Sequence, residues 1–132
     1  MPIFGSYSKE KLMFVDDRLR RVMDEAIKYW DFRVVSGYRD EEEQNRLADE
    51  GLSQVRYPES KHNTYPSLAV DIAPYPIDWK DQERFVLFAG GILTVARQLG
   101  IPLRWGGDWN MDDRVADTSF RDFGHFELVE RG

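Results

Sequence analysis

The absence of cysteine is the feature that most constrains how these 132 residues can fold. It excludes disulfides, cysteine-type zinc fingers, iron–sulfur clusters and thiol catalysis, so the fold depends on an apolar core of its own. Hydrophobic residues make up 42% of the chain and include eight Phe, six Tyr and four Trp, which is enough for such a core. The length is that of one compact domain, and we expect residues 1–132 to form a single domain.

The charge balance narrows the choice of partners. Lys and Arg number 18 against 24 Asp and Glu, a net charge of −6, which argues against a nucleic-acid binder. No stretch approaches the roughly 18 apolar residues of a membrane span, so we expect no stable membrane association. The first 17 residues contain Lys9, Glu10 and Lys11 and lack the apolar centre of a secretion signal. We therefore expect the chain to be made and kept in the cytoplasm.

Apolar spacing and turn-forming residues predict a mixture of helices and strands. The helices are expected from Ser6 or Ser8 to about Trp30, from 41 to 50 after a capping box at Asp40 and Glu43, and from 81 to 99. The strands are expected at 32–36, 68–73, 103–105 and 125–129, with loops at 52–67 and 106–122. Since these elements show no regular β-α-β alternation, the sequence predicts an α+β fold.

The chain has two histidines, and each lies near carboxylates in the sequence. His62 and Asp71 are nine residues apart, a separation that puts them on opposite sides of any single helix or strand. They can converge only if the chain turns between them, and Asn63 and Pro66 favour a turn. In the strand expected over 68–73, Asp71 stands between two alanines on the face opposite the core, which leaves space around its carboxylate.

The second histidine, His125, belongs to the last expected strand. Phe126 and Leu128 would face the core, which leaves His125 and Glu127 on the opposite, open face. Two imidazoles and one carboxylate are a known ligand set for catalytic zinc, with a fourth position left for water. One interpretation is therefore a metal site formed by the two histidines and Asp71. The other is that the histidines are ordinary surface or hydrogen-bonded core residues.

Several motifs occur in order along the chain: Ser36-Gly37-Tyr38-Arg39, Ser60-x-His62, Ala69-x-Asp71, Ala73-Pro74-Tyr75 followed by Ile77-Asp78-Trp79, Gly107-Asp108-Trp109-Asn110 and Asp122-x-x-His125. Together they resemble the zinc D-alanyl-D-alanine carboxypeptidase and dipeptidase family (VanY-like), and most of all its phage L-alanyl-D-glutamate endolysins. The similarity covers roughly residues 9 to 130. It implies an α+β fold of the hedgehog/DD-peptidase type, with a small, mainly antiparallel sheet and helices packed on one side.

The resemblance also implies the site. It puts the zinc ligands at His62, Asp71 and His125, counted by position in the motifs. The family places its first histidine and its aspartate closer together, with a Gly between them. We therefore interpret the segment around 65–67 as a two-residue loop insertion ahead of the strand, a change that loops tolerate.

Two further roles follow from the resemblance. Asp122 would be the catalytic base that takes a proton from a zinc-activated water and hands it to the leaving amine. Arg39 would meet the substrate carbonyl or the developing oxyanion, with a solvated surface arginine as the alternative. Glu127 competes for the role of base, and its other role would be to hold an imidazole in the right tautomer.

The function implied is a zinc-dependent peptidoglycan endopeptidase, a single catalytic domain that hydrolyses the L-Ala–D-Glu bond of stem peptides. The alternatives are a D-Ala-D-Ala carboxypeptidase or dipeptidase and a non-catalytic wall-binding module of the same fold. As in a phage endolysin, we expect a monomer that accumulates in the host cytoplasm until it is released to the cell wall in the periplasm.

One acidic segment, Asp108 to Asp113, has the alternating oxygen ligands with which a calcium loop begins. An EF-hand needs Gly where Asp113 stands and Glu where Ser119 stands. We therefore interpret the segment as a solvated acidic loop near the mouth of the site.

Overall fold

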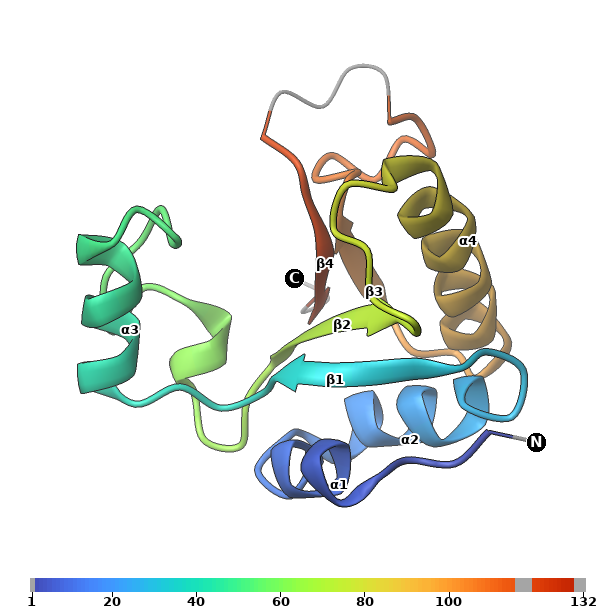
Figure 1. Ribbon diagram of the computed structural model, residues 1–132, viewed down its shortest axis with the longest axis horizontal. Coiled ribbons are helices and arrows are strands. Elements are labelled where there is room, and N and C mark those ends of the chain that lie inside the picture. The colour runs from blue at the N-terminus through green and yellow to red at the C-terminus, as the bar shows by residue number, and fades with distance from the viewer. Residues whose placement is uncertain (1, 116–119, 130–132) are drawn as a thin grey trace.

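The computed structural model describes residues 2–115 and 120–129, and a four-stranded sheet runs through its centre (Figure 1). The strands are β1 (Phe32–Ser36), β2 (Ala69–Pro74), β3 (Leu103–Gly106) and β4 (Asp122–Leu128). Their order in the sheet is β1-β2-β4-β3, and every neighbouring pair is antiparallel. The α+β class and the antiparallel sheet expected from the sequence are confirmed.

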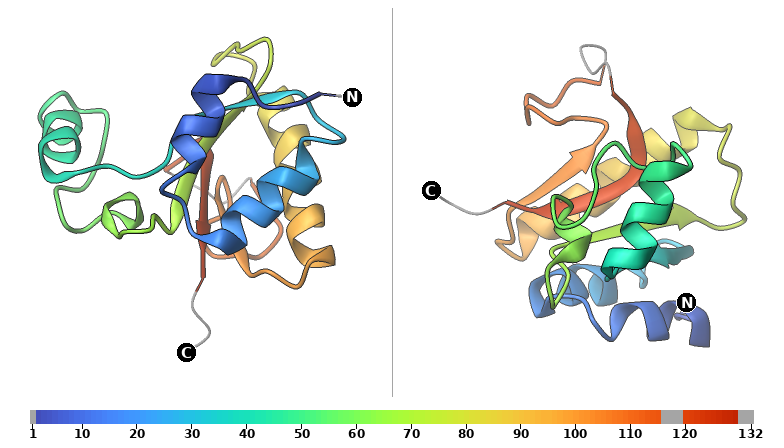
Figure 2. Two further views of the ribbon diagram at one scale, coloured as in Figure 1. Left: turned by 90° about the horizontal axis from the view of Figure 1, so that it is seen from below. Right: turned by 90° about the vertical axis from the view of Figure 1, so that its left-hand side faces the viewer.

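The helices are α1 (Ser6–Leu12), α2 (Asp17–Ala26), α3 (Glu41–Asp49) and α4 (Gln82–Gln98), and a short 3-10 helix, η1, spans Lys61–Asn63. Helices α2 and α4 cover one face of the sheet, as expected, whereas α3 and η1 lie beyond the other face (Figure 2). The site described below lies on that second face. Over the described part of the chain, no helix combines the length and the apolar character needed to cross a membrane.

The core fills the space between α2, α4 and the sheet. On α4 the apolar residues Phe85, Phe88 and Ile92 recur every three or four positions, and all of them are buried. Phe88 is fully buried and contacts two aromatic rings, Trp30 at 5.6 Å and Phe32 at 5.3 Å between centroids. These contacts fix the sheet against α4, and the site is built on the sheet's other face.

One side-chain cap and two glycines set the ends of α3 and α4. The Asp40 carboxylate accepts a hydrogen bond from the Glu43 backbone N–H and so caps the start of α3. Gly51 follows the end of α3 with φ of +75°, and Gly100 follows the end of α4 with φ of +71°. This left-handed conformation favours glycine and ends a helix.

The expectation of one continuous helix up to Trp30 is wrong, because the chain breaks between α1 and α2. Asp16 caps α2 with its own side chain, which accepts from the Arg18 backbone N–H. The chain before it pairs with the loop that leads into β2: Ser67 N–H donates to the Phe14 carbonyl, and Asp16 N–H donates to the Ser67 carbonyl. These backbone groups cannot also serve a helix. The apolar residues that recur at spacings of three and four are nevertheless all buried: Leu12, Val15, Leu19, Val22 and Ala26.

The last strand begins earlier than the sequence predicted. The expected loop up to residue 122 and the strand from 125 are corrected to a β4 that starts at Asp122, opposite Gly106 of β3. A Cβ atom at Gly106 would lie 2.0 Å from the Asp122 carbonyl oxygen, so only glycine permits this pairing. As a result Asp122 is held on the same strand as His125.

The packing of Phe88 yields a stability prediction. Replacing Phe88 with Ala removes a fully buried ring and leaves a cavity, and we expect it to lower the free energy of unfolding by about 3–5 kcal/mol. The matched control is Leu87→Ala in the same helix, whose side chain is exposed and whose loss should cost under about 0.5 kcal/mol. Urea denaturation of both variants measures the difference, and equal effects would show that this packing contributes little.

Candidate metal centre

Strand register brings two of the expected ligands face to face. Asp71 on β2 pairs with His125 on β4, and on its other side it pairs with Ser36 of β1, beyond a shift in register. Val70 and Ile72 are buried in the core, so Asp71 points to the opposite face, as the alternation predicted. The alanines on either side of Asp71, at 69 and 73, are fully buried and leave its carboxylate room.

His62 reaches the same place through the 3-10 helix η1. Ser60 caps η1 by accepting from the His62 backbone N–H, and Asn63 completes a capping box. The His62 Nδ1 lies 2.6 Å from the Gly37 carbonyl oxygen. A carbonyl oxygen only accepts, so Nδ1 carries the proton and Nε2 turns its lone pair toward Asp71. The turn between His62 and Asp71 that the sequence required is therefore present.

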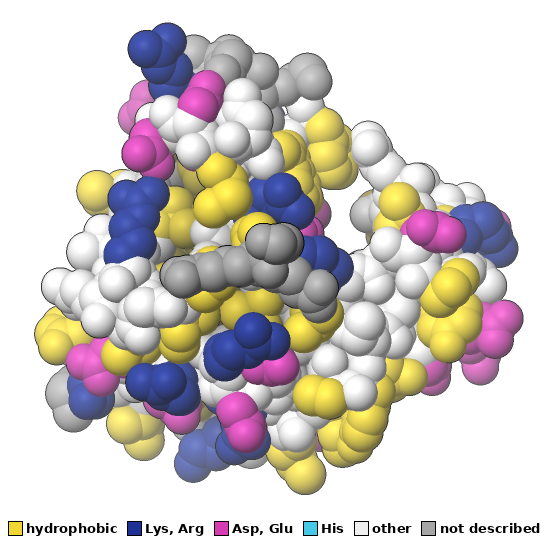
Figure 3. All heavy atoms as spheres, turned by 180° about the vertical axis from the view of Figure 1, so that it is seen from behind, with side chains coloured by type: hydrophobic (Ala, Val, Ile, Leu, Met, Phe, Trp, Pro, Cys, Tyr) yellow, Lys and Arg dark blue, Asp and Glu magenta, His cyan; other side chains and the backbone are white. Residues whose placement is uncertain are grey.

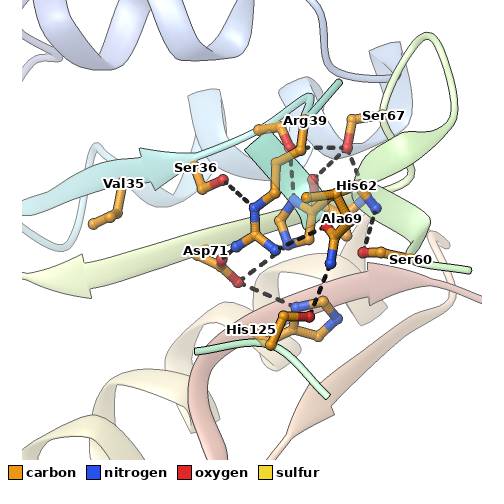
Figure 4. A network of polar contacts seen from close by, with 12 residues as sticks. Val35, Ser36, Arg39, Ser60, His62, Ser67, Ala69, Asp71 and His125 are labelled. Carbon is orange, nitrogen blue, oxygen red and sulfur yellow. Dashed lines mark hydrogen bonds and ion pairs between the residues drawn. The ribbon is translucent and has the colours of Figure 1, made fainter. Parts of the chain in front are cut away.

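The ligand atoms of His62, Asp71 and His125 converge, as Figure 4 shows, and all lie within 4.8 Å of one another. Asp71 Oδ1 stands between the rings, 3.3 Å from His62 Nε2 and 3.1 Å from His125 Nδ1. Nitrogen and oxygen ligands at ordinary zinc distances lie about 3 to 3.5 Å apart in a tetrahedral site, so this donor set fits zinc. Its three protein ligands leave a fourth position, as in catalytic sites.

The second nitrogen of His125 is held by Glu127. His125 Nε2 lies 2.9 Å from Glu127 Oε1, and the other carboxylate oxygen, Oε2, contacts Lys61 Nζ at 3.1 Å and Arg104 Nη2 at 3.0 Å. Donation of the Nε2 proton to Glu127 leaves Nδ1 free to bind a metal ion. Glu127 therefore makes the imidazole-orienting contact that the sequence analysis offered as one of its two roles.

Arg39 lies against the outer oxygen of the same aspartate. Its Nη2 is 2.6 Å from Asp71 Oδ2, its Nε donates to the Ser36 hydroxyl, and its Nη1 donates to Gln44 Oε1 (Figure 4). The side chain is 14% exposed. The alternative of a solvated surface arginine is therefore wrong, because Arg39 is largely buried and ion-paired within the site.

Gln44 is a site residue that the sequence analysis missed. It lies on α3, is fully buried, and donates through Nε2 to the Ser53 hydroxyl and the Val55 carbonyl. Its Oε1 accepts from Arg39 and from Asn63 Nδ2, next to His62. Gln44 thus ties α3 and the loop after it to the site. A polar residue on the buried side of a short helix was the available signal.

Asp122 lines the same pocket as the three converging residues, at the start of β4. Burial raises the pKa of its carboxyl above the usual value, and the negative charge of Asp71 adds to the effect, against the nearby His125, His62 and Arg39. A carboxylate with increased proton affinity is better suited to accept and return a proton near neutral pH.

The other carboxylates are held ionised by their neighbours. Burial opposes the charge of Asp71, but His62 and His125 hold its pKa well below the usual range. Burial likewise disfavours a charged His125, yet its hydrogen bonds to Asp71 and Glu127 raise its pKa to about 9. Burial would raise the pKa of Glu127, but His125, Arg104 and Lys61 bring it to about 2. The carboxylates thus hold a proton at His125, where a metal ion would compete with it.

A pocket of about 630 Å³ opens above these residues. The loop after α3, residues 52–55, forms one wall, and Trp109 and Phe120 line the pocket as well. The space-filling view from behind shows a notch between the α3 lobe and the body of the molecule (Figure 3). The pocket can therefore accept an extended chain that passes over the converging ligand atoms.

The acidic segment from 108 to 113 folds on itself near this pocket. The Asp108 carboxylate accepts from the backbone N–H groups of Asp112 and Asp113, at 3.2 and 2.8 Å. Asp108 is buried and Asp113 has a left-handed φ of 64°. Ser119, the position compared with an EF-hand glutamate, lies outside the described residues.

Comparison with known proteins shows which family the chain belongs to. The family model described as phage L-alanyl-D-glutamate peptidase matches residues 3–129. The L-alanyl-D-glutamate peptidase of Escherichia phage T5 is 36% identical over 135 aligned residues, covering 96% of this chain and 97% of the relative.

Two solved structures share the fold. The Serratia marcescens L-Ala D-Glu endopeptidase ChiX aligns with a TM-score of 0.75 and 29% identity, covering 96% of this chain and 89% of its own. The LdcB LD-carboxypeptidase aligns with a TM-score of 0.59 over 97% of this chain and 65% of its own, at 19% identity, a likeness of fold alone. The family match extends over nearly the whole chain and includes every residue of the site, so the chain belongs to the phage L-alanyl-D-glutamate peptidase family.

Proposed function

We propose that this protein is a zinc-dependent peptidoglycan endopeptidase that hydrolyses the L-Ala–D-Glu bond of stem peptides. The observation that carries the proposal is the convergence of His62, Asp71 and His125 at the floor of a pocket that also contains Asp122. Membership of the peptidase family supports the bond and the substrate. Zinc is supported by the ligand types, their spacing and the three-ligand geometry.

The ligand roles follow from the hydrogen bonds. His62 would bind the metal through Nε2, His125 through Nδ1 and Asp71 through Oδ1, since Gly37 and Glu127 engage the other ring nitrogens. A zinc ion bound there would supply Lewis acidity and lower the pKa of a water to about 7. Arg39 would neutralise Asp71 Oδ2 and keep Oδ1 turned to the histidines.

Asp122 would serve as general base and then as general acid. Its carboxylate would accept a proton from the attacking water and deliver it to the amine that leaves when the peptide bond breaks. The raised pKa of Asp122 favours both transfers. Glu127 is less suited to this role because His125, Lys61 and Arg104 already engage both of its oxygens and hold its pKa low.

Arg39 would act on the substrate as well as on Asp71. It lines the pocket and carries a full positive charge beside the ligand atoms, where negative charge develops on the carbonyl oxygen during attack. Its contacts to Ser36 and Gln44 fix the guanidinium before substrate arrives, so little reorganisation is needed.

The setting proposed for this activity is that of an endolysin. We propose that residues 1–132 act as one monomeric catalytic domain, accumulate in the host cytoplasm and reach the wall after release. Family membership and the relative from Escherichia phage T5 support this setting.

Digestion of purified sacculi tests the proposed function. The zinc-loaded protein should release peptides that begin at D-Glu and leave L-Ala on the glycan, and a chelated sample should release none. Mass spectrometry identifies the new ends. Release of D-Ala alone would assign the protein to the carboxypeptidases, and zinc binding without any soluble product would favour a wall-binding module.

Replacing Asp122 with Ala separates a base from a ligand. We expect kcat to fall by about 10²- to 10⁴-fold, as for the loss of a general base, while one zinc ion per chain is retained. Metal analysis and peptide turnover measure the two quantities. Asp24→Ala, a change at an exposed carboxylate of α2, is the control and should alter neither. Loss of zinc from the Asp122 variant would make Asp122 a ligand.

Replacing Glu127 with Ala should weaken zinc binding, whereas the Asp122 replacement should leave it unchanged. His125 loses the acceptor that orients its ring, so we expect zinc affinity to fall by about 10- to 100-fold. Competition with a chelating dye measures the affinity. Glu59→Ala is the control, since Glu59 is an exposed carboxylate that lines the same pocket. Unchanged zinc affinity with turnover abolished would make Glu127 the base.

A further inference from the structure

One wall of the pocket carries two basic side chains that the proposed reaction does not use. Lys61 precedes His62 on η1, and Arg104 lies on β3, directly opposite Glu127 of β4 in the strand register. Both line the pocket, and both are about 30% exposed at the side chain. In the space-filling view, basic side chains lie beside the notch that separates the α3 lobe from the body (Figure 3).

The two cations share a single carboxylate. Lys61 Nζ and Arg104 Nη2 both contact Glu127 Oε2, and among the described residues neither side chain forms an ion pair with any other acidic group. Two positive charges around one negative charge leave one positive charge in excess at this wall. His125 also donates to Glu127, so the orientation of the Glu127 carboxylate does not depend on both cations.

Lys61 and Arg104 have more N–H groups than their contacts to Glu127 and Leu128 use. A guanidinium has five N–H groups and an ammonium has three. Arg104 uses Nε and Nη2 on Glu127, and Lys61 uses one contact to Glu127 and one to the Leu128 carbonyl. The contacts to Glu127 also limit the side-chain freedom that a ligand would otherwise have to remove. A carboxylate is the group that matches fixed, charged donors of this kind.

The substrate of the proposed function supplies such a group next to the bond that is cut. A glutamate joined to its neighbours through its nitrogen and through one of its two carboxyls keeps the other carboxyl free. Lys61 and Arg104 lie beyond Glu127, on the side of the His125 ring away from the ligand nitrogen Nδ1. This wall is thus separated from the ligand atoms by one ring and one carboxylate.

We propose that Lys61 and Arg104 form a subsite for the free carboxylate of the D-Glu residue and so determine specificity for an acidic residue after the cut bond. This inference rests on the proposed function for the identity of the substrate. A neutral amide at that position would lose the charge-assisted hydrogen bonds, so the subsite also predicts discrimination against stem peptides whose glutamate is amidated.

Matched peptides test the subsite through turnover. One synthetic stem peptide carries the free carboxylate and the other carries the primary amide at the same position. We expect the unaltered enzyme to prefer the acid by about 10- to 100-fold in kcat/KM, the range for hydrogen bonds to a charged group. The double variant Lys61→Met, Arg104→Gln should bring the ratio near one. Any disturbance of His125 through Glu127 would slow both peptides alike, so the ratio isolates recognition.

Arg20→Gln is the control for the loss of a positive charge. Arg20 lies on α2, on the face of the sheet away from the pocket, and pairs with Asp17 at the surface. Its replacement should leave the acid-to-amide ratio as in the unaltered enzyme. A ratio that stays high in the double variant overturns the subsite and leaves the proposed function intact.

Binding provides a readout that does not depend on turnover. Calorimetry with the zinc-loaded Asp122→Ala protein should show the acid peptide binding at least about tenfold tighter than the amide. Adding the Lys61 and Arg104 replacements should remove the difference. If sacculi and both peptides stay uncut while this difference is found, the proposed function fails and the carboxylate subsite stands. Equal affinities for acid and amide overturn the subsite.

Discussion

The carboxylate of Asp71 is the group on which the geometry of the site depends. One oxygen stands between His62 and His125, and the other is held by Arg39. A largely buried carboxylate is costly unless it is fully paired, so its neighbours are constrained in position as well as in type. Those neighbours come from β1 and its following loop, from η1 and from β4, and the sheet order β1-β2-β4-β3 is what brings them to one residue.

The loop between η1 and β2 and the break in the N-terminal helix are joined by backbone pairing. The segment between His62 and β2 pairs through Ser67 with the backbone of Phe14 and Asp16. Tyr65 packs on the Phe14 ring at 5.8 Å and on Tyr38 at 5.4 Å between centroids. This loop is therefore docked on the chain between α1 and α2, where a continuous helix would leave no backbone groups to receive it.

Local patterns in the sequence were sufficient to predict most of the helices and strands. They also predicted the face on which two of the site residues lie. Alternation along β2 and β4 placed Asp71 and His125 on the face opposite the core, because successive side chains point to opposite faces of a strand and the apolar ones pack in the core. The same alternation would have placed Arg104 there too, since it lies between the buried Leu103 and Trp105. The fold class and the caps of α3 and α4 likewise rest on short-range patterns.

The rest of the site depends on contacts between distant segments, which no local pattern specifies. Arg39 and Asp71 are 32 residues apart in the chain, and Gln44 and Asn63 are 19 apart. The break between α1 and α2 is of the same kind, because the partner that interrupts the helix is the loop around Ser67. The candidate zinc ligands were predicted from a family resemblance, since spacing alone left their convergence open.

Glu127 links the metal site to the wall of the pocket. Its Oε1 orients a candidate zinc ligand, and its Oε2 gathers the two cations that we assign to the substrate carboxylate. Glu127 must be ionised both to orient His125 and to pair with the two cations, and its low pKa keeps it ionised.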